Sequence, residues 1–69
     1  MIYVFKTSVK TKSQVSQLRE AINNMLPNDR WNFDLEDCDK VLRIDSNENI
    51  VAGIRSLLQL HHFSCEELI

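Results

Sequence analysis

The spacing of the hydrophobic residues changes along this chain, and this feature constrains the fold more than any other. Residues 2–7 are rich in β-branched and aromatic side chains, which is typical of a strand. Between Val15 and Leu26 the apolar residues recur every three or four positions, as they do along a helix with one buried face. Thr11 and Gln14 fit a capping box before this helix, and Pro27 ends it because its ring clashes with the preceding turn. The first half therefore predicts a strand followed by a helix.

The next segment has the features of a β-hairpin. Residues 31–36 alternate between apolar and polar, which indicates a strand with one face in water. A short polar turn at residues 37–40 separates them from a second apolar stretch at residues 41–45. Two such stretches joined by a short turn predict a pair of antiparallel strands.

A second helix and a last strand complete the pattern. The predicted helix begins after an N-cap at Asp45 or Ser46. Its apolar residues again fall on one face, at Ile50, Ile54, Leu57 and Leu58. Residues 63–68 follow this helix and predict a final edge strand.

The predicted order is strand, helix, strand, strand, helix, strand. This order is typical of the ferredoxin-like α+β fold, a βαββαβ sandwich in which a four-stranded antiparallel sheet carries two helices on one face. Right-handed crossovers place the first strand beside the third and leave the second and fourth strands at the edges. We expect residues 1–69 to form one domain, because a chain of this length buries only about 60% of its surface and supports a single core.

Composition and charge argue against several functional classes. The longest apolar stretches are far below the ~20 residues that cross a bilayer, and no basic region precedes an apolar one, so we expect a cytoplasmic protein with no membrane partner. Eight Lys plus Arg against ten Asp plus Glu give a net charge of −2, which argues against nucleic acid as a partner. No nucleophile with a base and no Gly-rich phosphate loop is present, so we expect no enzymatic activity.

The predicted topology brings three loops together at one end of the sheet. They are formed by residues 10–12, 37–39 and 61–62, and they place Cys38, His61 and His62 at the same end. One Cys with one or two His would suit Zn(II) or Cu(I), although the spacing matches no established closed site. In the other interpretation Cys38 is an exposed turn residue, His61 and His62 are solvated residues at the end of the helix, and no cofactor is bound. Cys65 is predicted to be a small buried hydrophobic residue.

The helix-free face of the sheet is a candidate interaction surface. Alternation along the strands assigns one set of residues to the helix-covered face: Phe5, Thr7, Val9, Trp31, Phe33, Leu35, Leu42, Ile44 and Phe63. Ile2, Val4 and Val41 then form an exposed apolar patch with Lys6 and Arg43 at its rim. Such a face can dock a protein partner or a second copy of the chain. A shift of one residue in register would exchange the two faces.

Three segments together resemble a known family over the whole chain. They are FKTSVK at residues 5–10, WNFDLED at 31–37 with KVLRI at 40–44, and LLQLHHF at 57–63. In these segments the chain resembles the heavy-metal-associated domain, which forms small copper chaperones and the N-terminal modules of metal-transporting ATPases. The resemblance implies the βαββαβ fold.

The family's metal-binding motif is missing from this chain. The resemblance implies a C-x-x-C pair at the end of the first loop, where two thiolates would bind a soft cation such as Cu(I). Alignment of the first helix puts Thr11 and Gln14 at those two positions, and neither supplies a soft ligand. The leading hypothesis is thus a metal-free, non-enzymatic relative that acts as a protein-interaction module. The competing hypothesis is a metal carrier that uses Cys38, His61 and His62.

Overall fold

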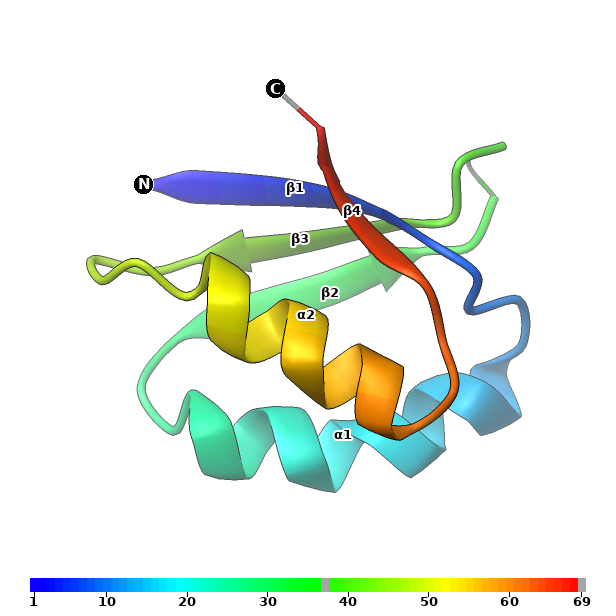
Figure 1. Cartoon of the computed structure of the whole chain (residues 1–69), viewed down its shortest axis with the longest axis horizontal. Helices are drawn as coiled ribbons and strands as arrows, with labels where there is room; N and C mark the ends of the chain where they lie inside the picture. The colour runs from blue at the N-terminus through cyan, green and yellow to red at the C-terminus, as the bar shows by residue number, and fades with distance from the viewer. Residues whose placement is uncertain (37, 69) are drawn as a thin grey trace.

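The elements follow one another in the order β-α-β-β-α-β, as the sequence predicts (Figure 1). The computed structural model describes residues 1–36 and 38–68. The bounds are β1 (Ile2–Thr7), α1 (Lys12–Met25), β2 (Arg30–Asp34), β3 (Val41–Asp45), α2 (Val51–Leu60) and β4 (Cys65–Leu68). The chain therefore has the ferredoxin-like α+β fold.

The sheet has the predicted strand order, β2-β3-β1-β4, and all three neighbouring pairs are antiparallel. Both helices lie on the same side of the sheet (Figure 1). Phe5 lies opposite Leu42, which in turn lies opposite Phe33, so the predicted inward residues share one face across three strands. Among the described residues, the other face carries no helix.

The core lies between the helices and the sheet and confirms the predicted face assignment. Its largest fully buried side chains come from both helices, from the two central strands and from the loop after β1: Phe5, Val9, Leu18, Ile22, Leu42, Ile44, Ile54 and Leu58. Trp31, Phe33, Leu35 and Phe63 are half-buried and pack against this cluster. Burial of this apolar surface is the main favourable contribution to folding.

The start and end of α1 follow from local chemistry. The Thr11 hydroxyl accepts a hydrogen bond of 3.1 Å from the Gln14 N–H, and Gln14 Oε1 accepts one of 3.3 Å from the Thr11 N–H. This reciprocal pair is the predicted capping box. Leu26 is the C-cap, directly before Pro27. Both bounds of the helix thus agree with the sequence signals.

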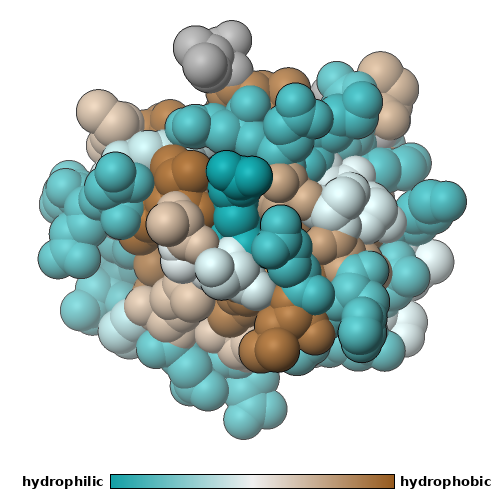
Figure 2. All heavy atoms as spheres, viewed as in Figure 1, coloured by the Kyte–Doolittle hydropathy of each residue, from teal (hydrophilic) through white to brown (hydrophobic). Residues whose placement is uncertain are grey.

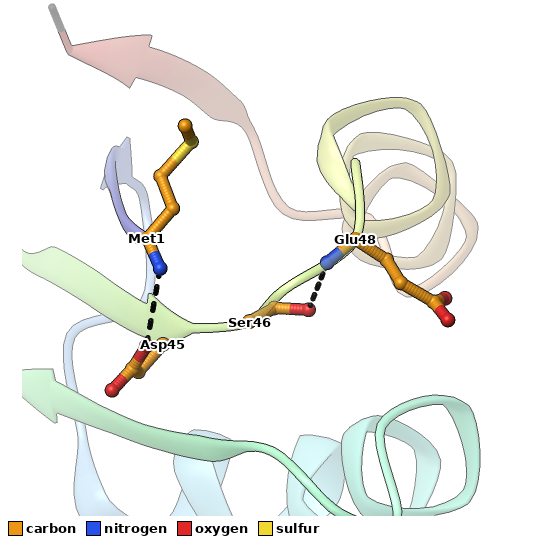
Figure 3. Close-up of polar contacts among 4 residues, drawn as sticks. All are labelled: Met1, Asp45, Ser46 and Glu48. Atoms are coloured by element: carbon orange, nitrogen blue, oxygen red, sulfur yellow. Dashed lines mark hydrogen bonds and ion pairs between the residues drawn. The ribbon is translucent and has the colours of Figure 1, made fainter.

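The predicted N-cap of α2 is wrong. Ile50 is the N-cap and makes no side-chain capping bond, so the helix begins at Val51, several residues after Asp45 and Ser46. The Ser46 hydroxyl instead accepts a 3.2 Å hydrogen bond from the Glu48 N–H, and Asp45 lies 3.5 Å from the Met1 ammonium (Figure 3). The Ser46–Glu48 bond stabilises a turn after β3 and competes with helix formation there, whereas the Asp45–Met1 ion pair joins the end of β3 to the start of the chain.

The C-terminal end of α2 is a Schellman motif. The Phe63 N–H donates to the Leu58 carbonyl at 2.8 Å, and the His62 N–H donates to the Gln59 carbonyl at 3.0 Å. His62 has a φ of 68°, the left-handed conformation that this motif requires and that usually belongs to glycine. The motif turns the chain back toward the sheet at Phe63.

Candidate interaction surfaces

Hydrogen bonds join the chain segments beside the three loops that were predicted to meet at one end of the sheet. The Thr7 N–H donates to the Asp39 carbonyl at 3.2 Å, which links the end of β1 to the β2–β3 turn. The Ser8 N–H donates to the Ser64 carbonyl at 3.3 Å, and the Ser64 N–H donates to the Ser8 hydroxyl at 2.9 Å. The buried Thr7 hydroxyl also donates to the Lys40 carbonyl at 2.7 Å. Hydrogen bonds that involve backbone groups therefore hold these segments together at this end of the sheet.

The candidate metal ligands do not come together at that end. Cys38, His61 and His62 are all exposed. Within residues 1–36 and 38–68, no three His, Cys, Asp or Glu side chains lie close enough together to hold a metal ion. Asp37, which belongs to the predicted turn, lies outside the described residues. The loops converge, but the described side chains form no ligand group there.

Cys65 is buried, as predicted, with 7% of its surface exposed. Burial raises the pKa of its thiol from 9.0 to about 11, and the positive charge of Arg55 opposes part of this increase. Both Cys38 and Cys65 are free thiols. Cys65 stays protonated at neutral pH and therefore acts as a small hydrophobic residue of the core.

The helix-free face carries charged side chains in an ordered pattern. In register across the sheet, Lys6 lies between Val41 and Glu66, and Arg43 lies 3.5 Å from the Asp34 carboxylate. A further ion pair of 3.8 Å joins Lys6 to Asp39, in the turn after β2. Charges of opposite sign thus alternate across the face.

Val41 is not part of an exposed patch, and this corrects the sequence prediction. It lies on the helix-free face but is only 4% exposed. Its neighbours in register are Lys6 on one side and Asp34 on the other. The aliphatic part of a lysine side chain covers apolar surface while its ammonium reaches water, and this accounts for the burial of Val41. Sequence alternation predicts the face of a residue but not the side chains that cover it.

The exposed apolar residues of this face lie nearer to β4. Ile2 is 59% exposed, Val4 is half-buried, and Leu68 is 36% exposed. Val4 lies directly opposite Leu68 in the β1–β4 pair. We call Ile2, Val4 and Leu68 the apolar strip. It retains two of the three predicted residues and replaces Val41 with Leu68.

A second surface, which the sequence analysis missed, is an open groove between α1 and β2. It encloses about 1030 Å³, and Lys12, Val15 and Arg19 of α1 line it opposite Trp31 and Phe33 of β2. The two aromatic rings meet edge to face, with centroids 5.8 Å apart. The sequence did contain a signal for this groove. It places Trp31 and Phe33 on a strand predicted to lie at the edge of the sheet, and helices cover an edge strand only in part.

The helix side of the molecule has no extended apolar patch on the face that Figure 2 shows. Hydrophobic surface there is divided by hydrophilic side chains. Leu60 and Met25 are the exposed large apolar residues of the helices among the described residues. Scattered apolar residues of this kind are normal on a protein surface.

Comparison with known proteins identifies no relative. No family model matches this chain, and neither a curated protein nor a solved structure matches it with significant similarity. Neither α1 nor α2 is long and apolar enough to span a membrane.

Proposed function

We propose that this chain is a non-enzymatic, cytoplasmic protein-interaction module, a relative of the heavy-metal-associated domain without its metal-binding cysteine pair. The observation that carries the proposal is the apolar strip on the helix-free face. Ile2, Val4 and Leu68 gather there beside alternating charges. An apolar centre with a charged rim is the usual composition of a protein interface.

The ferredoxin-like fold is compatible with a relation to the heavy-metal-associated domain, and the capping box supports a role without its metal-binding pair. In the sequence alignment Thr11 and Gln14 fall at the positions of the family's two cysteines, and in this chain each is bonded to the other at the start of α1. The loop that would present metal ligands in the family therefore stabilises a helix in this chain. This supports a role that does not depend on a bound metal.

The charges of the helix-free face favour a protein over a polyanion as partner. Lys6 lies opposite Glu66, and Arg43 lies beside Asp34, so no basic patch extends over the sheet. Phosphate neutralisation requires clustered basic side chains. A mixed pattern instead suits a protein surface of complementary charges, where it selects the orientation of docking.

The proposal is tested by a substitution in the strip and a matched control. Val4→Glu places a charge in the apolar strip, and Gln17→Glu places the same charge on the exposed surface of α1. Proteins captured by the wild-type chain are purified, and their affinities for the three chains are measured by calorimetry. We expect a partner that binds wild type and Gln17→Glu equally but binds Val4→Glu at least about tenfold more weakly. Equal binding to all three chains would overturn the proposed surface.

The metal hypothesis is tested separately. The reduced chain is titrated with Cu(I) and with Zn(II) against a competing chelator, and we expect no tight stoichiometric complex. A tight complex that is lost in Cys38→Ser and in His61→Ala would contradict the proposal and support a metal carrier.

A further inference from the structure

We propose that two copies of this chain pair through β2, so that their sheets join into one continuous sheet around a two-fold axis at Asn32. This surface is separate from the apolar strip, and the inference does not depend on the proposed function. It rests on the position of β2 in the sheet and on the order of its five residues.

The first observation is that β2 is an accessible sheet edge. It ends the strand order, and among residues 1–36 and 38–68 it pairs only with β3. The groove of about 1030 Å³ between α1 and β2 means that the helix does not close over this edge. The edge of a sheet offers backbone donors and acceptors to another strand unless it is covered or blocked.

The second observation is that β2 is complementary to itself when antiparallel. Its sequence, Arg30-Trp31-Asn32-Phe33-Asp34, pairs about Asn32 so that Arg30 lies opposite Asp34 of the second copy. Trp31 then lies opposite Phe33 of the second copy. Opposite charges and aromatic pairs are favourable across antiparallel strands, and the two-fold axis produces each of them twice.

Charges of opposite sign also alternate across the boundary between the two joined sheets. Arg30 lies opposite Asp45 within its own sheet, and Asp34 lies in the row of Lys6 and Glu66. The joined row therefore reads Asp45, Arg30, then Asp34, Lys6 and Glu66 of the second copy, and the sign alternates at every charged position. Asp34 contacts Arg43 at 3.5 Å and accepts a 3.2 Å hydrogen bond from the Glu36 N–H, and its side chain is 37% exposed at the edge that would face the second copy.

Arg30 and Asp34 also select the register in which the two copies of β2 pair. If the second copy moves by two positions in either direction, both Arg30–Asp34 pairs are lost and fewer strand residues are paired. The axis perpendicular to the sheet keeps the helices of both copies on one side. The groove beside β2 leaves space there for the aromatic side chains of both strands.

The opposite edge of the sheet does not offer this pairing. The β4 strand, Cys65-Glu66-Glu67-Leu68, would pair about Glu66 or about Glu67, and either axis would place that glutamate opposite the same residue of a second copy. Like charges directly opposite each other destabilise a strand pair, and acidic side chains on a short edge strand prevent association. Among the two edges, β2 is thus the one suited to a second copy.

Charge reversal at the two ends of β2 tests the proposal. We expect the wild-type chain to sediment as a dimer, and Arg30→Asp or Asp34→Arg to raise the dissociation constant by about tenfold or more. An equimolar mixture of the two variants should recover the dimer, because each copy then meets the opposite charge at both ends. A wild-type chain that stays monomeric at about 1 mM would overturn the proposal. A dimer that is lost in Val4→Glu but kept in Arg30→Asp would also overturn it.

A cross-linking variant provides a measurement that does not depend on charge. The axis places Asn32 opposite itself, where the Cα atoms of an antiparallel pair lie about 4.5–5.5 Å apart and within the range of a disulfide. In a Cys38→Ser background, Asn32→Cys should form covalent dimers with diamide as oxidant. Gln17→Cys on α1 is the matched control and should not. Equal cross-linking of the two variants would contradict the proposed axis.

Discussion

The indole N–H of Trp31 donates a 2.9 Å hydrogen bond to Oδ1 of Asn23, which ties the edge strand β2 to α1. Trp31 is half-buried against the core, and Asn23 lies on the exposed surface of the helix. Both residues line the groove between the two elements.

We expect Asn23→Ala to reduce the free energy of unfolding by about 0.5–1.5 kcal/mol relative to its control, because the indole N–H loses its partner. Asn24→Ala is the control, since it makes the same gain in helix propensity without a bond to Trp31. Urea denaturation followed by Trp31 fluorescence measures both variants. Equal stability of the two would show that water replaces Asn23 without cost.

The burial of Val41 predicts a large difference between two residues of the helix-free face. Val41→Ala should lower the free energy of unfolding by about 1–2 kcal/mol, because it removes buried methyl groups. Ile2→Ala, at a position that is 59% exposed, should cost less even though it removes a larger side chain. Denaturation midpoints of the two variants provide the measurement. A larger loss of stability in Ile2→Ala than in Val41→Ala would contradict the burial of Val41.

The left-handed backbone conformation of His62 predicts that glycine at this position stabilises the protein. Its φ of 68° is a conformation that costs a residue with a Cβ atom roughly 1 kcal/mol, so His62→Gly should raise the free energy of unfolding by up to about that amount. His61→Gly is the matched control, because His61 has a φ of −93° and gains nothing from glycine. Thermal unfolding followed by circular dichroism compares the two. A loss of stability in both variants would contradict the role assigned to the Schellman motif.

The raised pKa of Cys65 predicts a loss of stability in alkaline solution. The folded state holds the thiol proton up to a pKa of about 11, whereas the unfolded state releases it near 9.0. The folded state therefore binds more protons between these values, and the free energy of unfolding falls as the pH rises from about 9 toward 11. Cys65→Ala should reduce this slope, and Cys38→Ala should retain it. Urea denaturation across this pH range measures the difference.

The elements that the sequence predicts well are those with local signals. Thr11, Gln14 and Pro27 determine where α1 begins and ends, and all three act within a few residues of the helix ends. The start of α2 was misplaced because Ser46 has the chemistry of an N-cap but uses it in a turn. Local sequence does not distinguish these two uses of a serine hydroxyl.

The surfaces were harder to predict because they depend on distances between elements. Alternation placed Val41 on the correct face, but its burial depends on side chains from β1 and β2. The groove beside Trp31 depends on the separation of α1 from the sheet edge, which no short segment encodes. The helix-covered face was predicted correctly because apolar residues on every strand share it.

The central position of β1 has a consequence for how the chain is made. Of the four strands, β1 is synthesised before the others, yet its two neighbours in the sheet are β3 and β4, and β4 is synthesised after the other three. Both edges of β1 therefore cannot be paired until β4 has been synthesised. Until then the apolar side chains of β1 lack their native neighbours, and unpaired strand edges of this kind favour association with other unfolded chains.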